Sequence, residues 1–281
     1  MIGYLLYKIG ELLITLFPLN IAYRIGIFFS TAQFMFSAKD RSAVVNNLLI
    51  ICPNESEEEL LRKAKEVFIN FGLYLVEFFR YKKIDKAYIR KYVSLRGFEH
   101  VDNALKNGTG AILLTAHMGN WELAGMAFGL LGYPIAAIAL DHKNKKINQF
   151  FRIRRESKGV ENIALGVSAR SCLRALRENK LVAIVGDRDF SNTGKRINFL
   201  GREKKIPRGP AVLALRSGAP ILPVLVIRQP DRSLVMECFP PLTIASGSSE
   251  EEIIHQYVAI FEDQIKKYPS QWLMFQEFWK E

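Results

Sequence analysis

The stretch of residues 111–125, AILLTAHMGNWELAG, constrains the fold more than any other part of this chain. Its first six residues, Ala111 to Ala116, are apolar or small and predict a buried strand. The chain then breaks at residues 117–120, and helix-forming residues resume at Trp121. This order predicts a strand that leads directly into a helix. His117 lies at the carboxyl end of that strand, where α/β folds tend to place their sites.

His117 and Glu122 form a candidate acid–base pair. A neutral imidazole acts as a base when an acceptor holds one ring nitrogen and the other presents a lone pair to a substrate hydroxyl. Glu122 follows in the first turn of the predicted helix, and Gly119 leaves the backbone free to fold the two together. The spacing therefore indicates proton abstraction from an alcohol. The same spacing also fits a surface pair or a histidine satisfied within the core.

Strands and helices alternate along the rest of the chain. The patterns predict strands at 93–95, 135–140, 182–185, 221–227 and 234–238, and helices at 101–106, 147–158, 168–178, 210–217 and 250–267. Such alternation is typical of an α/β fold with a mostly parallel sheet flanked by helices. The 281 residues suffice for one large domain, and no repeat or low-complexity linker divides it.

The charge balance bears on the partners of this chain. The sequence carries 39 basic and 28 acidic residues, a formal net charge of +11. This excess favours anionic partners: phosphate groups, acidic membrane surfaces, acyl carrier protein or coenzyme A. Nucleic acid would satisfy the same charge, but the basic residues are scattered and no nucleic-acid-binding motif occurs. We therefore predict no nucleic-acid partner.

The cysteines argue against several kinds of chemistry. Cys52, Cys172 and Cys238 are widely separated and form no Cys-x2-Cys pair, so we predict neither a zinc site nor a disulfide framework. No Gly-x-Ser-x-Gly elbow occurs, and no cysteine adjoins a histidine. A hydrolase built on a serine or cysteine nucleophile is therefore disfavoured. We expect no metal and no cofactor.

The N-terminus contains two strongly apolar runs. They cover residues 12–23 and 25–36, with Arg24 between them and Pro18 inside the first. Neither run reaches the length of about 18 charge-free residues that is typical of a spanning helix. No basic start precedes a small-residue cleavage site, so a cleaved signal peptide is not expected. Three interpretations stay open: a kinked membrane anchor, helices lying in the membrane interface, or helices buried in a soluble core.

Four blocks in this chain carry a family resemblance. They are HMGNWELAG at 117–125, RESKG at 155–159, GDRDF at 186–190 with Gly194 and NFLG at 198–201, and PRGPA at 207–211 continuing to SGAPILP at 217–223. In this order they resemble the lysophospholipid acyltransferase superfamily, whose first motif is His-x4-Asp/Glu. The branch they resemble most contains the bacterial lipid A lauroyl and myristoyl transferases and the mycobacterial phosphatidylinositol mannoside acyltransferases. The likeness covers nearly the whole chain and extends to QWL at 271–273. There, this chain continues with MFQ, where relatives often have aromatic, histidine and arginine residues.

The resemblance implies a glycerol-3-phosphate acyltransferase-like fold and a membrane-associated acyltransferase. Such an enzyme moves a fatty acyl group from acyl carrier protein or coenzyme A to a hydroxyl of a glycolipid acceptor, here a lipid A precursor-like one. In this reaction His117 removes the proton as the hydroxyl attacks the thioester, and Glu122 orients the ring and stabilises the imidazolium. No covalent acyl-enzyme is required, because the thioester is already activated.

The matching blocks also supply candidate substrate-binding residues, namely Asn120, Arg155, Asp187, Arg188, Asp189, Gly194 and Arg208. A guanidinium matches phosphate oxygens bidentately, so Arg155 is a candidate phosphate clamp, or equally a solvated helix cation. The two acids around Arg188 follow a predicted strand and can order a head group, hold Arg155, or form a loop salt bridge. Residues 194–208 are expected to form a basic active-site loop, in which Phe199 and Leu200 either cover an acyl chain or pack locally.

Membrane association follows from the lipid acceptors of the resembled family. We expect residues 1–38 to be membrane-associating helices and residues 39–281 a single α/β domain facing the cytosol at the bacterial inner membrane. One alternative is an acyl-glycerophosphate acyltransferase, although its usual Phe-Pro-Glu-Gly-Thr-Arg block is absent here. Another is a non-catalytic membrane-surface protein, against which the intact His117 and Glu122 argue. Arginine at 188 is typical of the mannoside enzymes, whereas lipid A enzymes more often have a neutral residue, so the acceptor stays open.

Overall fold

A seven-stranded sheet forms the centre of the protein, seen in a computed structural model that describes residues 2–139, 144–165, 168–190 and 192–280. Its strands run in the order β1-β9-β8-β2-β5-β3-β4. Every neighbouring pair is parallel except β8 and β9, which confirms the predicted mostly parallel sheet. The bounds are β1 Val93–Arg96, β2 Ala111–Thr115, β3 Ile135–Ala139, β4 Val160–Ala164, β5 Leu181–Val185, β8 Ile221–Arg228 and β9 Leu234–Cys238. Residue 140, the end of one predicted strand, lies outside the described residues.

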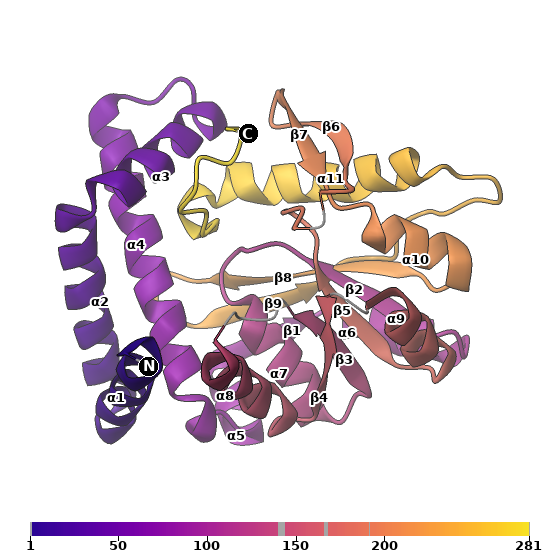
Figure 1. Cartoon of the computed structure of the whole chain (residues 1–281), viewed down its shortest axis with the longest axis horizontal. Coiled ribbons are helices and arrows are strands. Elements are labelled where there is room, and N and C mark those ends of the chain that lie inside the picture. The colour runs from indigo at the N-terminus through magenta and orange to yellow at the C-terminus, as the bar shows by residue number, and fades with distance from the viewer. Residues whose placement is uncertain (1, 140–143, 166–167, 191, 281) are drawn as a thin grey trace.

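Helices cover both faces of this sheet, which is why the central strand β2 is buried at all five positions. One face carries α5 (Lys86–Tyr92), α6 (Phe98–Lys106), α7 (Trp121–Leu131) and α8 (Lys145–Glu156). The other carries α9 (Ser168–Arg177), α10 (Gly209–Ser217) and α11 (Glu250–Lys267). Figure 1 shows α10 and α11 above the sheet and α7 and α8 below it. The apolar run at 111–116 is therefore a strand buried on both sides, as its sequence predicts.

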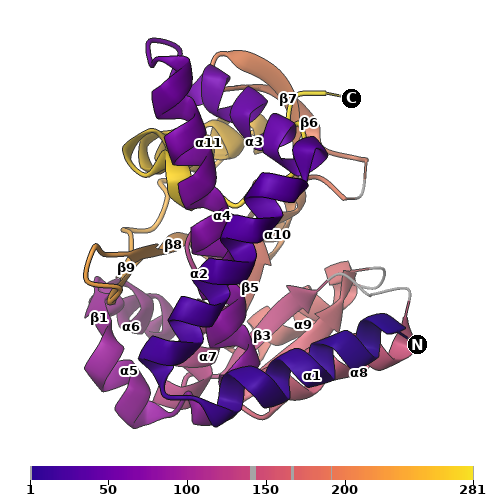
Figure 2. The ribbon, with the colours of Figure 1, turned by 90° about the vertical axis from the view of Figure 1, so that its left-hand side faces the viewer.

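The first four helices form a layer beside the sheet (Figure 1). They are α1 (Ile2–Leu16), α2 (Leu19–Phe36), α3 (Ala38–Ile51) and α4 (Glu57–Phe79), and short 3-10 turns occur at Tyr81–Lys83 and Pro269–Gln271. Pro18 precedes the first residue of α2, so the proline, and not Arg24, separates the two apolar segments. Helix α2 packs along α4, and α1 contacts α8 (Figure 2). Among the described helices, none combines the length and apolar character that crossing a bilayer requires.

An antiparallel hairpin replaces the loop that we predicted over residues 194–208. Strands β6 (Lys195–Phe199) and β7 (Arg202–Ile206) pair directly, so the loop prediction is wrong. Leu200 and Gly201 both have a positive φ, the conformation of a two-residue hairpin turn whose twist matches that of the strands. Phe199 is fully buried against Trp272 and Phe278, and neither it nor Leu200 lines the large cavity described below. The aromatic ring therefore packs locally instead of covering an acyl chain.

A buried ion pair joins the N-terminal helices to the sheet. Glu77 on α4 accepts from both Nη atoms of Arg228, at 2.7 and 2.9 Å, where β8 ends. The Tyr23 hydroxyl on α2 donates to the same carboxylate, as does the side-chain amide of Asn120 just before α7. Burial alone would lower the pKa of Arg228, but the Glu77 carboxylate raises it above its ordinary value. One carboxylate thus fixes three separate elements relative to α4.

We expect Glu77→Ala to destabilise the protein by about 3–5 kcal/mol, because it leaves the buried Arg228 guanidinium without its counter-charge. Urea unfolding of the purified protein measures the change. The matched control is Glu66→Ala on the same helix, which removes an exposed pair with Arg62 and is expected to cost less than about 0.5 kcal/mol. Equal costs for the two variants would contradict a structural role for the buried pair.

Candidate active site

The loop between β2 and α7 carries His117 and is fixed by backbone hydrogen bonds to distant segments. The Gly119 amide donates to the Gln271 carbonyl at 2.9 Å, and the Leu273 amide donates to the His117 carbonyl at 2.8 Å. Gly119 has a φ of 58°, and a Cβ there would lie 1.6 Å from the Val226 carbonyl oxygen. Only glycine fits this close approach. The loop therefore has one path, which places the His117 side chain at the carboxyl edge of the sheet.

Asp187 is the carboxylate that holds the imidazole. Its Oδ1 lies 2.7 Å from Nδ1 of His117, while its Oδ2 accepts from the His117 amide at 3.1 Å and from Nε1 of Trp272 at 2.9 Å. A carboxylate oxygen only accepts, so Nδ1 carries a proton, and in the neutral ring Nε2 is the nitrogen with the lone pair. Burial alone would raise the pKa of the fully buried Asp187, but the His117 ring and these donated hydrogen bonds lower it below its ordinary value. The pair has the geometry of an oriented general base.

Glu122 does not contact the imidazole, so the predicted His117–Glu122 pairing is corrected. Among the described residues no hydrogen bond or ion pair joins the two. From the first turn of α7, Glu122 instead reaches Arg155 on α8, which donates through Nε at 2.9 Å and through Nη2 at 2.5 Å. The cause is topological: Asp187 follows β5, the parallel neighbour of β2, and so ends beside His117. Whether Glu122 takes part in catalysis stays a prediction.

The Arg155 guanidinium forms hydrogen bonds to other side chains of the protein. Besides Glu122, it donates to the Asn162 side chain at 3.3 Å. Burial alone would lower the pKa of the Arg155 guanidinium, but the Glu122 carboxylate raises it. The predicted phosphate clamp is therefore occupied by a carboxylate, although both partners line the same cavity as His117. The sequence left open that the acids around Arg188 hold Arg155, but Asp187 holds His117 instead, which none of the predicted alternatives included.

Two predicted substrate-binding residues are buried and act through their neighbours. Asp187 holds His117, as described above. Asn120 accepts from the Leu123 amide at 3.0 Å with its Oδ1, which caps α7, and donates to Glu77 with its Nδ2 at 2.5 Å. Neither side chain lines the cavity. Their prediction as substrate contacts is corrected to positioning, because each polar atom that would face a ligand is already used inside the protein.

Three of the other four candidates line the cavity. Arg188 donates to the Gln276 side chain at 2.6 Å and lies over the Phe190 ring, and Arg208 pairs with Glu250 at 2.6 Å. Asp189 accepts from the Gly194 amide at 2.7 Å. A Cβ at Gly194 would lie 2.5 Å from the Ile206 carbonyl oxygen, so glycine is required where the hairpin begins. Arg188, Asp189 and Arg208 line the cavity, whereas Gly194 is not among the lining residues and contacts it through Asp189.

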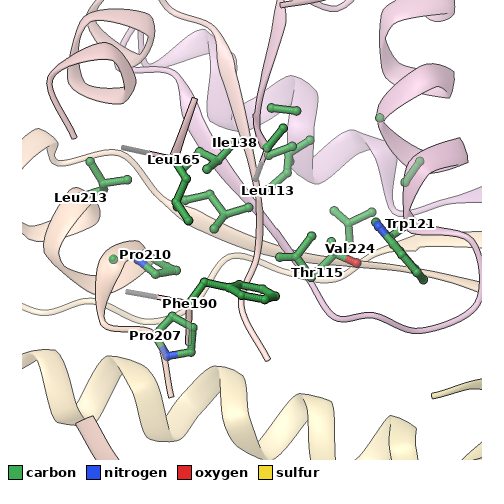
Figure 3. A pocket seen from close by; sticks show the side chains of 18 of the residues that line it. Leu113, Thr115, Trp121, Ile138, Leu165, Phe190, Pro207, Pro210, Leu213 and Val224 are labelled. Carbon is green, nitrogen blue, oxygen red and sulfur yellow. The ribbon is translucent and has the colours of Figure 1, made fainter. Parts of the chain in front are cut away.

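The cavity next to His117 has a volume of about 730 Å³ and a mostly apolar lining. That volume lies in the range typical of ligand pockets. The Trp121 ring packs edge-on against the His117 ring, with centroids 5.0 Å apart. Figure 3 shows Trp121, Thr115 and Val224 at one end of the cavity, and Pro210 and Leu213 at the other. The arrangement combines a positioned base with space for a long apolar group.

Sequence reasoning missed the part played by Trp272, whose Nε1–H donates a hydrogen bond to Asp187 Oδ2 at 2.9 Å. Its only signal was the QWL ending. Burial raises the pKa of Cys172 to about 11 and of Cys238 to about 12, so neither thiol is a ready nucleophile. Within the ranges that the structure describes, no group of three or more His, Cys, Asp or Glu side chains is placed to bind a metal ion.

Comparison with known proteins identifies a family and several relatives of this chain. The family model described as bacterial lipid A biosynthesis acyltransferase matches residues 1–281. A phosphatidylinositol mannoside acyltransferase of Mycobacterium tuberculosis is 31% identical over 217 residues, covering 75% of this chain and 68% of that protein. A lipid A biosynthesis palmitoleoyltransferase of Escherichia coli is 24% identical over 238 residues, covering 84% and 77%. The lipid A biosynthesis lauroyltransferase of the same organism is 24% identical over 251 residues, covering 84% and 79%.

Replacing Asp187 by Asn is expected to cost about 1.5–3 kcal/mol of stability at neutral pH, because hydrogen bonds to a charged group are lost. The folded-state pKa of Asp187 is lowered, so its contribution is present above the ordinary value of 3.8 and is lost as the pH falls through the folded value. The difference in free energy of unfolding between wild type and Asp187→Asn should therefore become smaller below about pH 4.

Urea unfolding at a series of pH values measures that difference. Asp263→Asn, at an exposed position on α11, is the control and should show little difference at any pH. If the difference in free energy of unfolding stays constant or grows in acid, the claim that Asp187 stabilises the fold as a carboxylate is contradicted.

Proposed function

Because the chain belongs to the family of bacterial lipid A biosynthesis acyltransferases, we propose that it transfers a fatty acyl group from an acyl thioester to a hydroxyl of a membrane glycolipid. The observation that carries this proposal is the His117–Asp187 pair beside a large apolar cavity. The pair supplies a base for the hydroxyl, and the cavity supplies room for an acyl chain. The family match and the names of the relatives support the reaction class independently of the geometry.

The proposed mechanism follows from the tautomer of His117. Nε2 takes the proton of the acceptor hydroxyl while that oxygen attacks the thioester carbonyl, forming a tetrahedral intermediate. Asp187 stabilises the imidazolium that results, through the hydrogen bond at Nδ1. Collapse of the intermediate forms the ester and breaks the carbon–sulfur bond, and the imidazolium returns the proton to the leaving thiolate. Every proton is accounted for without a covalent acyl-enzyme.

The acceptor is proposed to be a phosphate-bearing glycolipid. Arg188, Arg208 and Arg216 all line the cavity, so its lining includes three guanidinium groups that a head group could contact. Guanidinium forks match phosphate oxygens well. A lipid A precursor-like acceptor and a mannosylated phosphatidylinositol both carry phosphate, and the relatives act on one or the other by name. We propose two candidate acyl donors, the acyl thioesters of acyl carrier protein and of coenzyme A, which the transfer assay below compares.

Membrane association is proposed through α1 and α2. Large apolar side chains on these helices and on the link between them are exposed, namely Ile9, Leu12, Leu13, Leu16, Phe17, Ile21, Phe28, Phe29, Met35 and Phe36. A soluble surface rarely shows an apolar area of this kind without a partner, and interfacial helices bury it among lipids. Residues 1–38 are accordingly proposed to lie on the membrane, with residues 39–281 as the catalytic domain. A bacterial inner-membrane location facing the cytosol is part of this proposal.

Acyl transfer tests the mechanism. Purified protein is given labelled acyl carrier protein or acyl-coenzyme A together with lipid A precursor or phosphatidylinositol mannosides, and products are resolved by mass. We expect His117→Ala and Asp187→Asn to lower the rate by factors on the order of 10²–10⁴, since the base is removed or misoriented. Glu122→Gln should lower it less and mainly raise KM, because it weakens only the Arg155 pair in the cavity wall.

Asp263→Asn is the matched control for this assay and is expected to keep the wild-type rate. Circular dichroism confirms that each variant is folded before its rate is compared. An active Asp187→Asn together with an inactive Glu122→Gln would overturn the assignment of Asp187. The absence of any transfer by wild type from either donor would overturn the proposed function.

Vesicle binding tests the proposed membrane face. Removing two exposed aromatic rings from α2 in Phe28→Ser/Phe29→Ser should weaken binding to vesicles of phosphatidylglycerol and phosphatidylethanolamine by roughly tenfold or more, given the apolar area lost. Co-sedimentation measures the effect. Leu215→Ser, an exposed apolar residue on α10 far from these helices, is the control and should bind as wild type does (Figure 1). Unchanged binding by the aromatic variant would contradict this orientation.

A further inference from the structure

The residues that line the cavity come from both faces of the sheet, and we call the two parts of the lining the α7 lobe and the α10 lobe. Successive residues of a strand point to opposite faces, and the lining residues divide accordingly. The α7 lobe includes Leu113, Gly125, Phe128, Ala137, Ala183 and Val224, on the face covered by α7 and α8. The α10 lobe includes Ile138, Leu173, Ile184, Gly209, Leu213 and Arg216, on the face covered by α9 and α10. In Figure 3, Val224 of the first group and Leu213 of the second lie at opposite ends, while Leu113 and Ile138 lie side by side between them.

The two lobes differ in charge. The charged side chains that line the α7 lobe, Glu122 and Arg155, neutralise each other through two hydrogen bonds. In the α10 lobe Arg208 pairs with Glu250, so Arg216 supplies the positive charge of its lining. An alkyl chain gains most from an uncharged environment, whereas phosphate gains from guanidinium groups. The α7 lobe therefore suits the acyl chain, and the α10 lobe suits a phosphate-bearing group.

Gly125 leaves space in the wall of the α7 lobe. A Cβ at this position would meet no atom within 4 Å, and its φ is not in the left-handed region. Gly129, one turn further along α7, differs: a Cβ there would lie 2.0 Å from the Lys158 carbonyl oxygen, so close packing requires that glycine. Glycine inside a helix is unfavourable relative to other residues. No packing contact accounts for Gly125, but an open lobe does.

We propose that Gly125 sets the length of the acyl chain that the enzyme transfers, by leaving room in the α7 lobe for the distal methylenes of the donor. The inference rests on the proposed acyltransferase function. Helix α7 begins at the His117 end of the cavity with Trp121, and Gly125 follows one helical turn deeper. A side chain at 125 would therefore obstruct the lobe beyond the reacting carbonyl and leave the His117–Asp187 pair untouched.

The test is the chain-length profile of Gly125→Leu. Acyl-coenzyme A donors from octanoyl to stearoyl are compared at a fixed acceptor, the one that wild type uses, and kcat/KM is measured for each. We expect the optimum to move to shorter donors, with kcat/KM for the wild-type optimum falling by a factor on the order of 10–100 and that for octanoyl-coenzyme A kept. Leucine favours the helix more than glycine does, so the variant is expected to fold.

Gly209→Leu is the matched control. A Cβ at Gly209 also meets no atom within 4 Å, but the position lies in the α10 lobe, so the same substitution should leave the chain-length optimum where it is. A shift in Gly209→Leu without one in Gly125→Leu would overturn the proposal by assigning the chain to the other lobe. An unshifted profile in an active Gly125→Leu would overturn it too.

If Gly125→Leu transfers no acyl group from any donor, the chain-length profile of Gly125→Ala tests the proposal instead. A smaller shift toward shorter donors in that variant supports the proposal, and an unshifted profile overturns it. Wild-type turnover separates this inference from the proposed function. Wild type that transfers no acyl group from any donor contradicts the function itself, whereas an active wild type with an unresponsive Gly125 contradicts only the role of this residue.

Discussion

The hydrogen bond between His117 and Asp187 depends on the register of two parallel strands. Thr115 of β2 lies opposite Val185 of β5, and each functional residue follows two positions later. Because parallel strands end at the same edge of a sheet, residues 70 positions apart in sequence are brought to 2.7 Å. The segment at 271–273 then fixes both partners, through Trp272 on Asp187 and through backbone bonds to the loop at His117 and Gly119. The order of the strands is therefore as necessary for this general base as the two residues themselves.

A second buried carboxylate, Glu77, supports this edge from the N-terminal side. It binds Arg228 at the end of β8 and Asn120 at the start of α7, and it accepts from Tyr23 on α2. Burying a charge is costly unless every partner is present, so these groups hold one another in a single arrangement. The helix that carries the proposed membrane contacts Phe28 and Phe29 is therefore in direct contact with the scaffold of the site.

The cavity explains several small residues that the fold alone does not require. A space of about 730 Å³ in an apolar core forgoes packing contacts that would otherwise stabilise the protein. Alanines on β3 and β5 and Gly125 on α7 keep one lobe open, and the charges of Glu122 and Arg155 cancel in its wall. Sites of this kind are where a sequence departs from what close packing alone would select.

The sequence by itself determined the elements whose signals are local. Three features were predictable: the strand at 111–116, the helix that starts near Trp121, and the alternation of strands and helices downstream. Strand burial and helix periodicity depend on residues that are close together in the sequence. The strand β4 and the β6–β7 hairpin were not predicted, although the Leu200-Gly201 turn signals the hairpin. Only the tertiary structure decided which carboxylate holds His117. The spacing to Glu122 is a local measure, whereas the partner of an imidazole is set by the order of the strands in the sheet, which brings Asp187 to the ring and leaves Glu122 to Arg155.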